Sequence, residues 1–479
     1  MVNKFLTSKH LDFLCLIVIL LTFPIFFFKL GQSSLVSFDE AWYADIARNI
    51  LKRGDIVNLW WNGKVFTDHP PAGFWLVALS YKLFGISDFS ARAAQAISGI
   101  LTLVLVFFLG KKLFNRFTGV FAALALSSSP WFVFRARSGN LDAILTMFFV
   151  LTILLALYAS ENKKFLISFA LSLSLLFLTK TAAPFTIIPA VVIIFWRSRS
   201  VKVKDLILPT CILLGIFGGW FLYQMSKDTV FFRHYFKIGL PGVESATSYL
   251  DNLALMKEYL HNGVGKWFWP GVISIFVGVF TFQKRFIILF IFFISFFLPF
   301  LTSSKGHIWQ LIPLHPFMIL AFFGFLWVAG DRLSRIVEVL NEKFVKKKDF
   351  KNFTMALRKP LLDFSIFLIF LFFYYPQVKR NWYEFIDIPA FVSDEAILSR
   401  EASKFKEQFY VDEDFGPSAI FYSEKNVQQI RNEELQELFG SNEHFILITH
   451  QWRLDGAVIP NKEYEIIKKD RDKILIRRI

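Results

Sequence analysis

The chain has 479 residues, of which 55% are hydrophobic and 61 are phenylalanine, and its formal net charge is +15. Apolar runs of about 20 residues, the length that crosses a bilayer core, recur along its first three quarters, which excludes a soluble globular protein. The two cysteines, Cys15 and Cys211, both lie inside apolar runs. This placement excludes a disulfide framework or a cysteine-based metal cluster.

The positive charge is unevenly distributed along the chain. Residues 380–479 contain 19 Asp and Glu against 14 Lys and Arg, a net charge of −5, so the preceding residues carry +20. The basic residues of that first part lie between apolar runs. This is the positive-inside pattern of a membrane protein, and we expect no nucleic-acid partner.

The first apolar run, Leu11 to Phe28, follows Lys4 and Lys9 and lacks a small-residue cleavage site, so we interpret it as a retained anchor. It begins a series of eleven predicted spans. They are 11–31, 91–110, 118–134, 141–159, 165–179, 184–196, 205–223, 267–283, 286–301, 308–329 and 360–375.

Alternation from a cytoplasmic N-terminus makes every inside loop basic, including a predicted long loop from Asp331 to Lys359. The outside then receives the first long loop, residues 32–90, the turns near Arg135 and Lys180, and the acidic tail. The phenylalanine- and lysine-rich composition suggests a bacterial plasma (inner) membrane. We therefore predict a multi-pass protein with its active site and its C-terminal domain on the extracytoplasmic side.

The tail after Tyr375 changes character. Its pattern predicts strands at Ser418–Ser423, His444–Thr449, Tyr464–Lys468 and Lys473–Arg477, and helices at Glu395–Gln408 and Asn432–Phe439. We thus expect a transmembrane catalytic domain over residues 1–379 and a soluble α/β domain over residues 380–479. The predicted fold class is a polytopic α-helical membrane protein, with about 11 transmembrane helices and a small extracytoplasmic α/β domain.

Two adjacent carboxylates, Asp39 and Glu40, follow the first span. One interpretation is structural, because Ser37 and Glu40 have capping-box spacing and acids in a first helical turn oppose the helix dipole. The helix that follows is predicted to be amphipathic and to lie on the membrane surface. Its apolar side contains Trp42, Ile46 and Ile50, and its polar side contains Asp45, Arg48, Asn49 and Lys52.

Further ionisable residues lie at the outside ends of spans, where charge is costly and functional roles are common. They are Asp68, His69, Arg135, Arg137, Asp142, Lys180, Lys305 and His307. Each also has a structural interpretation: the arginines can reach lipid headgroups, His69 can shape a turn before Pro70, and Asp142 can cap a helix. Their placement on one face favours an active site.

Carboxylates beside cations at a membrane surface suit transfer from a lipid-linked phosphate. A base removes a proton from an acceptor hydroxyl, and cations stabilise the departing phosphate. Asp68 and His69, with Asp39 or Asp142, could also hold a divalent metal ion, although this spacing is not specific.

The sequence resembles the multi-span GT-C glycosyltransferases of the protein O-mannosyltransferase and lipid A aminoarabinose transferase superfamily. The resembling segments are 38–43, 69–75, 137–142, 179–180 and 305–316, collinear over about 300 residues, and the outside C-terminal domain resembles that of the aminoarabinose branch.

The resemblance implies a polyprenyl-phosphate sugar donor and an inverting transfer, with Asp39 catalytic and Asp142 a second active-site acid. It implies phosphate contacts by Arg137, Lys180 and Lys305, and we add His307 beside Lys305 to this set. Glu40 is included as a supporting residue. His69 departs from the aminoarabinose branch, which has lysine before the two prolines, and this leaves donor contact and metal dependence open.

The predicted function is transfer of a hexosyl or pentosyl group to a lipid, glycolipid or protein acceptor. A transporter or flippase of a lipid-linked sugar is the alternative, because it also needs many spans and intramembrane charges. Transporters commonly show matching broken helices and midplane charges, whereas these charges gather at one face. A scaffold whose acidic tail binds partners would explain the tail but not the loop charges.

Overall fold

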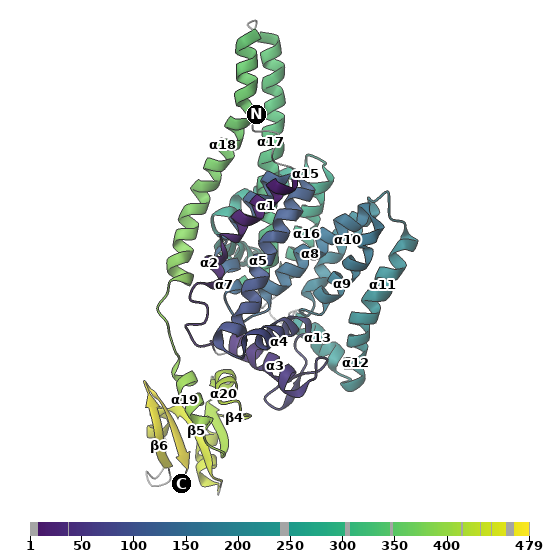
Figure 1. Ribbon diagram of the computed structural model, residues 1–479. Helices are drawn as coiled ribbons and strands as arrows, with labels where there is room; N and C mark the ends of the chain where they lie inside the picture. Colours follow the sequence, from purple (N-terminus) through teal and green to yellow (C-terminus); the bar gives the residue numbers. More distant parts are fainter. Residues whose placement is uncertain are drawn as a thin grey trace.

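The computed structural model describes residues 8–36, 38–239, 249–301, 307–344, 348–412, 415–431, 433–441, 443–456 and 464–478. A bundle of apolar helices forms most of the molecule, and a small domain built on a β-sheet lies at one end of it (Figure 1).

Each of the eleven predicted spans contains helix in its described part. The bundle helices are α1 (Ser8–Leu20), α2 (Phe23–Phe27), α5 (Asp88–Leu113), α6 (Arg116–Leu126), α7 (Pro130–Ala136), α8 (Asp142–Glu161), α9 (Leu166–Phe177), α10 (Ile188–Trp196), α11 (Ile207–Leu213), α12 (Gly219–Lys227), α15 (Phe268–Val279), α16 (Lys284–Leu301), α17 (His315–Phe344) and α18 (Lys348–Asn381). Between α12 and α15 lie α13 (Phe231–Gly239) and α14 (Tyr249–Val264).

Among the described residues, six helical stretches are long and apolar enough to cross a membrane, or seven if α6 and α7, bent by 71°, form one span. This makes the chain a multi-pass membrane protein. The predicted spans 165–179, 184–196 and 267–283 correspond to shorter helices. In the predicted span 184–196, Pro184 and Pro189 interrupt regular helical hydrogen bonding. Helix α10 therefore begins only after a 3₁₀ turn.

The bundle is closely packed where α5 crosses α6. A β-carbon added to Gly110 of α5 would come within 2.6 Å of the α-carbon of Gly119 in α6. Only glycine allows the two backbones to approach this closely.

The predicted inside connection from Asp331 to Lys359 is helical in its described parts. Helix α17 continues to Phe344 and α18 begins at Lys348. A charged segment can continue a helix, because lysine, arginine and glutamate are good helix formers. Asp331 and Arg335 form an ion pair one helical turn apart, at 2.7 Å.

The first long loop folds into helix α3 (Asp39–Arg53), a hairpin of β1 (Leu59–Trp61) and β2 (Lys64–Phe66), and helix α4 (Ala72–Phe84). Asn62 and Gly63 form the hairpin turn with positive φ angles of 49° and 76°, which these two residue types tolerate best.

The C-terminal domain has five strands in the order β4-β3-β5-β7-β6. They are β3 (Gln408–Asp412), β4 (Val427–Ile430), β5 (Phe445–His450), β6 (Tyr464–Asp470) and β7 (Lys473–Arg478), and the helices are α19 (Asp394–Ala402), α20 (Gly416–Ser423), α21 (Glu434–Gly440) and α22 (Gln451–Gly456). β3 is parallel to both β4 and β5, whereas β7 is antiparallel to β5 and β6.

Two predictions for this domain are wrong. Residues Ser418–Ser423 form part of helix α20 rather than a strand, and the helix predicted to reach Gln408 ends at Ala402, so that Gln408 begins β3. Every residue of α20 is buried. A short helix buried on all sides has no amphipathic period, which is why its apolar run resembles a strand.

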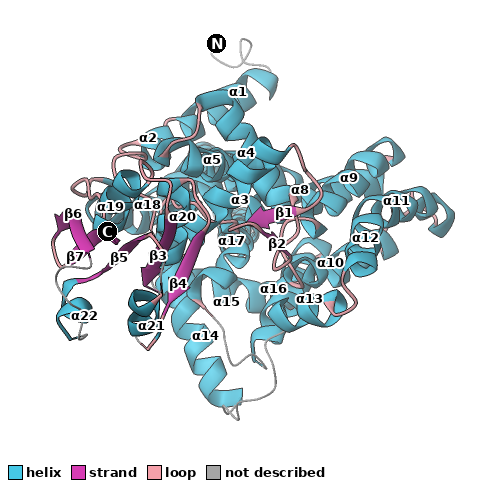
Figure 2. Ribbon diagram, turned by 90° about the horizontal axis from the view of Figure 1, so that it is seen from below, coloured by secondary structure: helices cyan, strands magenta, loops and turns pink. Residues whose placement is uncertain are grey.

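On the polar side of α3, Asp45 and Arg48 are buried, whereas Lys52 is exposed. Arg48 and Asp45 form a buried ion pair, and Arg48 donates hydrogen bonds to the carbonyl oxygens of Phe421 (2.6 Å) and Ile420 (3.1 Å) near the end of α20. Figure 2, viewed from the sheet end, shows the hairpin β1–β2 and the sheet at the same end of the bundle. Arg48 on the polar side of α3 therefore joins the two domains.

Candidate active site

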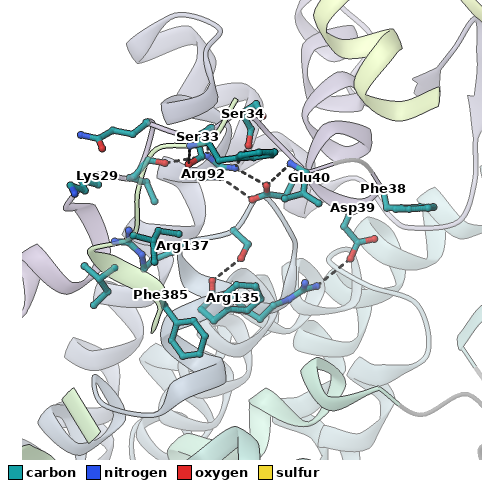
Figure 3. A pocket seen from close by; sticks show the side chains of 18 residues that line it. Lys29, Ser33, Ser34, Phe38, Asp39, Glu40, Arg92, Arg135, Arg137 and Phe385 are labelled. Atoms are coloured by element: carbon teal, nitrogen blue, oxygen red, sulfur yellow. Dashed lines mark hydrogen bonds and ion pairs between the residues drawn. The ribbon is translucent and has the colours of Figure 1, made fainter. Parts of the chain in front are cut away.

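Asp39 is the first residue of α3, and Phe38 before it has a φ of 72° and a ψ of −128°. Such a backbone is rare for a bulky residue and costs on the order of 1–3 kcal/mol. The side chain of Asp39 is 39% exposed, and its Oδ2 atom lies 3.2 Å from Nη2 of Arg135 (Figure 3). The strained entry to α3 thus presents a carboxylate that is both accessible and held by a cation.

Asp142, the first residue of α8, is buried and fully paired. Its Oδ2 atom accepts a hydrogen bond from Nε of Arg135 (2.8 Å) and forms an ion-pair contact with Nη2 (2.6 Å), and its Oδ1 atom lies 2.7 Å from Nζ of Lys180. The guanidinium of Arg135 therefore joins Asp39 to Asp142. A carboxylate with this many cationic donors stays ionised and is suited to hold cations in place rather than to take up a proton.

Glu40 is buried in a second ion pair that lies beside the first. Nε and Nη2 of Arg92 donate to its two oxygens at 2.9 and 2.7 Å. The backbone N–H groups of Val36 and Gly139 donate to it at 2.9 and 2.6 Å. Burial by itself would raise the pKa of Glu40, but the charge and hydrogen bonds of Arg92 outweigh it and hold this pKa below its usual value.

Arg92 also shapes the chain that precedes the acidic pair. Its guanidinium donates to the carbonyl oxygens of Leu30, Ser33 and Ser34. Glu40 and Arg92 thus fix the path by which the chain enters α3, and Glu40 is suited to position Asp39. The capping partner Ser37 lies outside the described residues.

Sequence reasoning missed Arg92 as a site residue because it falls inside the predicted span 91–110. Its presence in an otherwise apolar run was the available signal, since a charge at membrane depth marks a functional or paired position by default.

Arg137 has carbonyl partners but, among the described residues, no carboxylate. It donates to the carbonyl oxygens of Ile25 (3.0 Å) and Phe28 (2.8 Å). Burial, and then the nearby charge of Arg92, lower its pKa to about 10, so it remains protonated at pH 7. A guanidinium carries five N–H donors, which leaves Arg137 with donors for an anion.

A cavity of about 450 Å³ connects these groups. Asp39, Arg135 and Arg137 line it together with Lys29 and the aromatic side chains of Phe38, Phe134, Phe385 and Phe391, and Figure 3 shows them around one space. The cavity therefore combines an apolar wall with a carboxylate and several cations.

His307 and Lys180 border the same cluster. His307 stacks on Trp309 with ring centroids 4.5 Å apart, and the guanidinium of Arg135 lies over the Trp309 ring at 5.0 Å. Burial lowers the pKa of His307. Lys305, the other residue predicted here, lies outside the described residues.

Asp68 and His69, the predicted metal ligands, have different partners. Asp68 lies 2.8 Å from Nε2 of His234, and Nε2 of His69 lies 3.0 Å from the hydroxyl of Tyr43. Burial lowers the pKa of His69 to about 3. In the part of the chain that the structure describes, no three His, Cys, Asp or Glu side chains gather to hold a metal ion. Metal binding by Asp68 and His69 therefore stays a prediction.

Parts of the sequence are similar to known proteins. A family model for dolichyl-phosphate-mannose-protein mannosyltransferases matches residues 68–225. An uncharacterised protein of Aquifex aeolicus is 32% identical over 217 residues, 44% of this chain and 43% of that protein. An undecaprenyl phosphate-alpha-4-amino-4-deoxy-L-arabinose arabinosyl transferase of Pseudomonas savastanoi is 34% identical over 134 residues, 28% of this chain and 25% of that protein. In these alignments the chain spans less than half the length of either relative.

Solved structures extend the likeness to the whole chain. ArnT from Cupriavidus metallidurans in the apo state superposes with a TM-score of 0.72 at 16% identity, covering 98% of each chain. The apo oligosaccharyltransferase of Archaeoglobus fulgidus gives a TM-score of 0.59 at 13% identity, covering 92% of this chain and 70% of that one. The chain is thus a multi-pass membrane protein with the GT-C glycosyltransferase fold, which confirms the resemblance inferred from the sequence.

Proposed function

We propose that this protein is a membrane glycosyltransferase that moves a hexosyl or pentosyl group from a polyprenyl-phosphate donor to a hydroxyl of an acceptor, with Asp39 as general base. The observation that carries this proposal is the contrast between the acids of the site. Asp142 and Glu40 are buried and fully paired, whereas Asp39 is 39% exposed in a cavity that also contains cations.

The proposed reaction is a direct displacement at the anomeric carbon. The Asp39 carboxylate takes the proton of the acceptor hydroxyl while the hydroxyl oxygen attacks that carbon. The bond from the carbon to the phosphate oxygen breaks, and its electron pair leaves with the polyprenyl phosphate. Attack opposite the leaving group inverts the anomeric configuration. A positioned general base typically increases the rate of such a reaction 10²–10⁴-fold.

Arg137 is the proposed contact for the phosphate. It has unused donors, no carboxylate partner among the described residues, and a position on the wall of an apolar cavity. Burial removes water that would solvate the charged guanidinium, and an anion bound there would stabilise that charge instead. Lys180 and Arg135, held by Asp142, would add positive charge as the phosphate leaves.

The names of similar proteins support a lipid-phosphate donor. The Pseudomonas savastanoi relative is named for undecaprenyl phosphate, and ArnT of Cupriavidus metallidurans has been solved bound to that lipid. The Archaeoglobus fulgidus enzyme has been solved with a dolichol-phosphate. The basic loops and the acidic tail support an orientation in which the N-terminus is cytoplasmic. The site would then face the extracytoplasmic side of the plasma membrane.

The test is donor turnover by the purified full chain in nanodiscs, given a panel of polyprenyl-phosphate sugars and a membrane extract as acceptor. Wild type, Asp39→Asn and the control Asp251→Asn, which changes an exposed acid of α14, are compared. We expect transfer by wild type and control and a loss of at least 100-fold in Asp39→Asn.

Full activity of Asp39→Asn would remove Asp39 from the role of base. If no variant consumes a donor but all translocate a labelled lipid-linked sugar across vesicles, the protein is a flippase instead.

A further inference from the structure

A second cavity, of about 900 Å³, lies between the two domains. One side is the hairpin β1–β2 with Trp42 of α3, and the other is the edge strand β4 with the turn before it. We call this space the interdomain cleft. Its volume is within the range of small-molecule sites, and the mechanism proposed above does not use it.

Three aromatic side chains line one part of the cleft. The rings of Trp42 and Trp61 lie 4.9 Å apart at 42°, and Phe66 packs edge-on against Trp42 at 5.6 Å. The indole N–H groups of Trp42 and Trp61 are enclosed and have no hydrogen-bond partner among the described residues. Both nitrogens are enclosed, so a ligand in the cleft would meet the partly exposed rings rather than the N–H groups, and such rings favour apolar or C–H surfaces.

Amide side chains line the opposite part. Asn426 and Gln428 are exposed on the β4 side, and Gln408 lies beside them. An amide both donates and accepts hydrogen bonds, which matches a hydroxyl group. The charged residues of the lining are one base, Lys64, and one acid, Asp68, so the cleft does not favour a strongly charged ligand.

An extended peptide is the competing occupant, because β4 is an edge strand that could pair with another chain. However, the side chain of Asn62 already occupies that edge. Its Nδ2 donates to the carbonyl oxygen of Val427 and its Oδ1 accepts from the N–H of Val427, both at 2.8 Å. This bidentate contact uses the backbone groups that strand pairing would need.

We propose that the interdomain cleft binds a neutral saccharide portion of the acceptor. Aromatic faces pack against the C–H groups of sugar rings, and the amides hydrogen-bond to hydroxyls. Trp42 lies one helical turn after Asp39, so a saccharide held here would be near the base. This inference rests on the proposed glycosyltransferase function and narrows its acceptor to a glycan or glycolipid.

The test measures saccharide binding without turnover. Saturation-transfer NMR is recorded on the full chain in nanodiscs with maltotriose, triacetylchitotriose and a neutral Ser/Thr/Gly hexapeptide as probes. The cleft variant is Asn426→Ala with Gln428→Ala. Both positions are exposed, so the fold should be kept. Gln436→Ala, an exposed amide of α21 outside the cleft, is the matched control.

We expect at least one trisaccharide to bind wild type and Gln436→Ala alike, and its signal to fall at least fivefold in the double variant. Trp61→Leu, which removes the aromatic face but keeps an apolar side chain, should reduce the signal about threefold. Absence of trisaccharide binding, a signal unchanged in the double variant, or binding of the hexapeptide in the cleft instead would overturn the proposal.

The two proposals can fail separately. If wild type binds a trisaccharide in the cleft but consumes no polyprenyl-phosphate donor, the transferase function fails and the saccharide site stands. If donor is consumed but no trisaccharide binds, only the inference about the cleft fails.

Discussion

Nη2 of Arg135 lies 3.2 Å from Oδ2 of Asp39, and the same nitrogen also contacts Asp142. The most exposed acid of the site is therefore linked through one guanidinium to a buried acid. This link holds Asp39 in place without burying it. Arg135 contacts Asp142 through two nitrogens, whereas it contacts Asp39 through one nitrogen at a longer distance.

Arg135→Lys should lower kcat about 100-fold, in the range seen when one preorganised charge is removed from an active site. A lysine cannot donate to both carboxylates in the fixed geometry of a guanidinium. Steady-state kinetics should show the loss in kcat rather than in the KM for donor. Arg332→Lys, an exposed change in α17, should leave both constants unaltered, and an unchanged kcat in Arg135→Lys would contradict the proposed role.

Glu40→Gln should reduce the free energy of unfolding by about 3–5 kcal/mol, because it leaves the charge of Arg92 buried without its partner. Thermal unfolding in detergent measures this. The control is Glu424→Gln, which breaks the exposed pair with Lys52 and should cost no more than about 1 kcal/mol. Equal effects of the two changes would show that Glu40 and Arg92 do not act as a buried pair.

His69 predicts a pH dependence of stability. Its pKa is about 3 in the folded protein and near 6.5 when unfolded, so between these values the unfolded chain binds the extra proton. Stability therefore falls as the pH is lowered below 6.5, by at most about 2 kcal/mol at pH 5. His69→Gln should weaken the fall in unfolding temperature between pH 7 and pH 5, whereas the exposed His261→Gln should not. The same fall in wild type and His69→Gln would contradict this assignment.

Arg48→Gln should loosen the contact between the domains. It leaves Asp45 buried without its cation and removes the donors to the end of α20, at a cost of about 3–5 kcal/mol. Hydrogen exchange should increase in α20, and limited proteolysis should release the C-terminal domain sooner. Lys52→Gln, on the exposed part of the same helix, serves as the control, and unaltered exchange in Arg48→Gln would show that other contacts hold the domain.

The apolar runs were enough to predict where the bundle helices lie, because a segment inside lipid must satisfy its own backbone and only a helix does so locally. The positions of Asp39, Arg137, Asp142 and Lys180 at the outside ends of spans likewise predicted that they share one face. Asp39 and Asp142 are joined through Arg135, Lys180 pairs with Asp142, and Arg137 lines the same cavity as Asp39.

Pairing between distant residues was decided only by the tertiary structure. Glu40 and Arg92 are 52 residues apart, and Arg48 and Phe421 are 373 apart, so no local pattern relates them. Helix α20 was also not predictable from the sequence, because its burial on all sides removes its amphipathic signal. Nor was the interdomain cleft, because its walls come from opposite ends of the chain. The sequence alone determined which segments enter the membrane, since each does so by its own hydrophobicity. The fold determined which charges neutralise one another, because that depends on burial and distance in three dimensions.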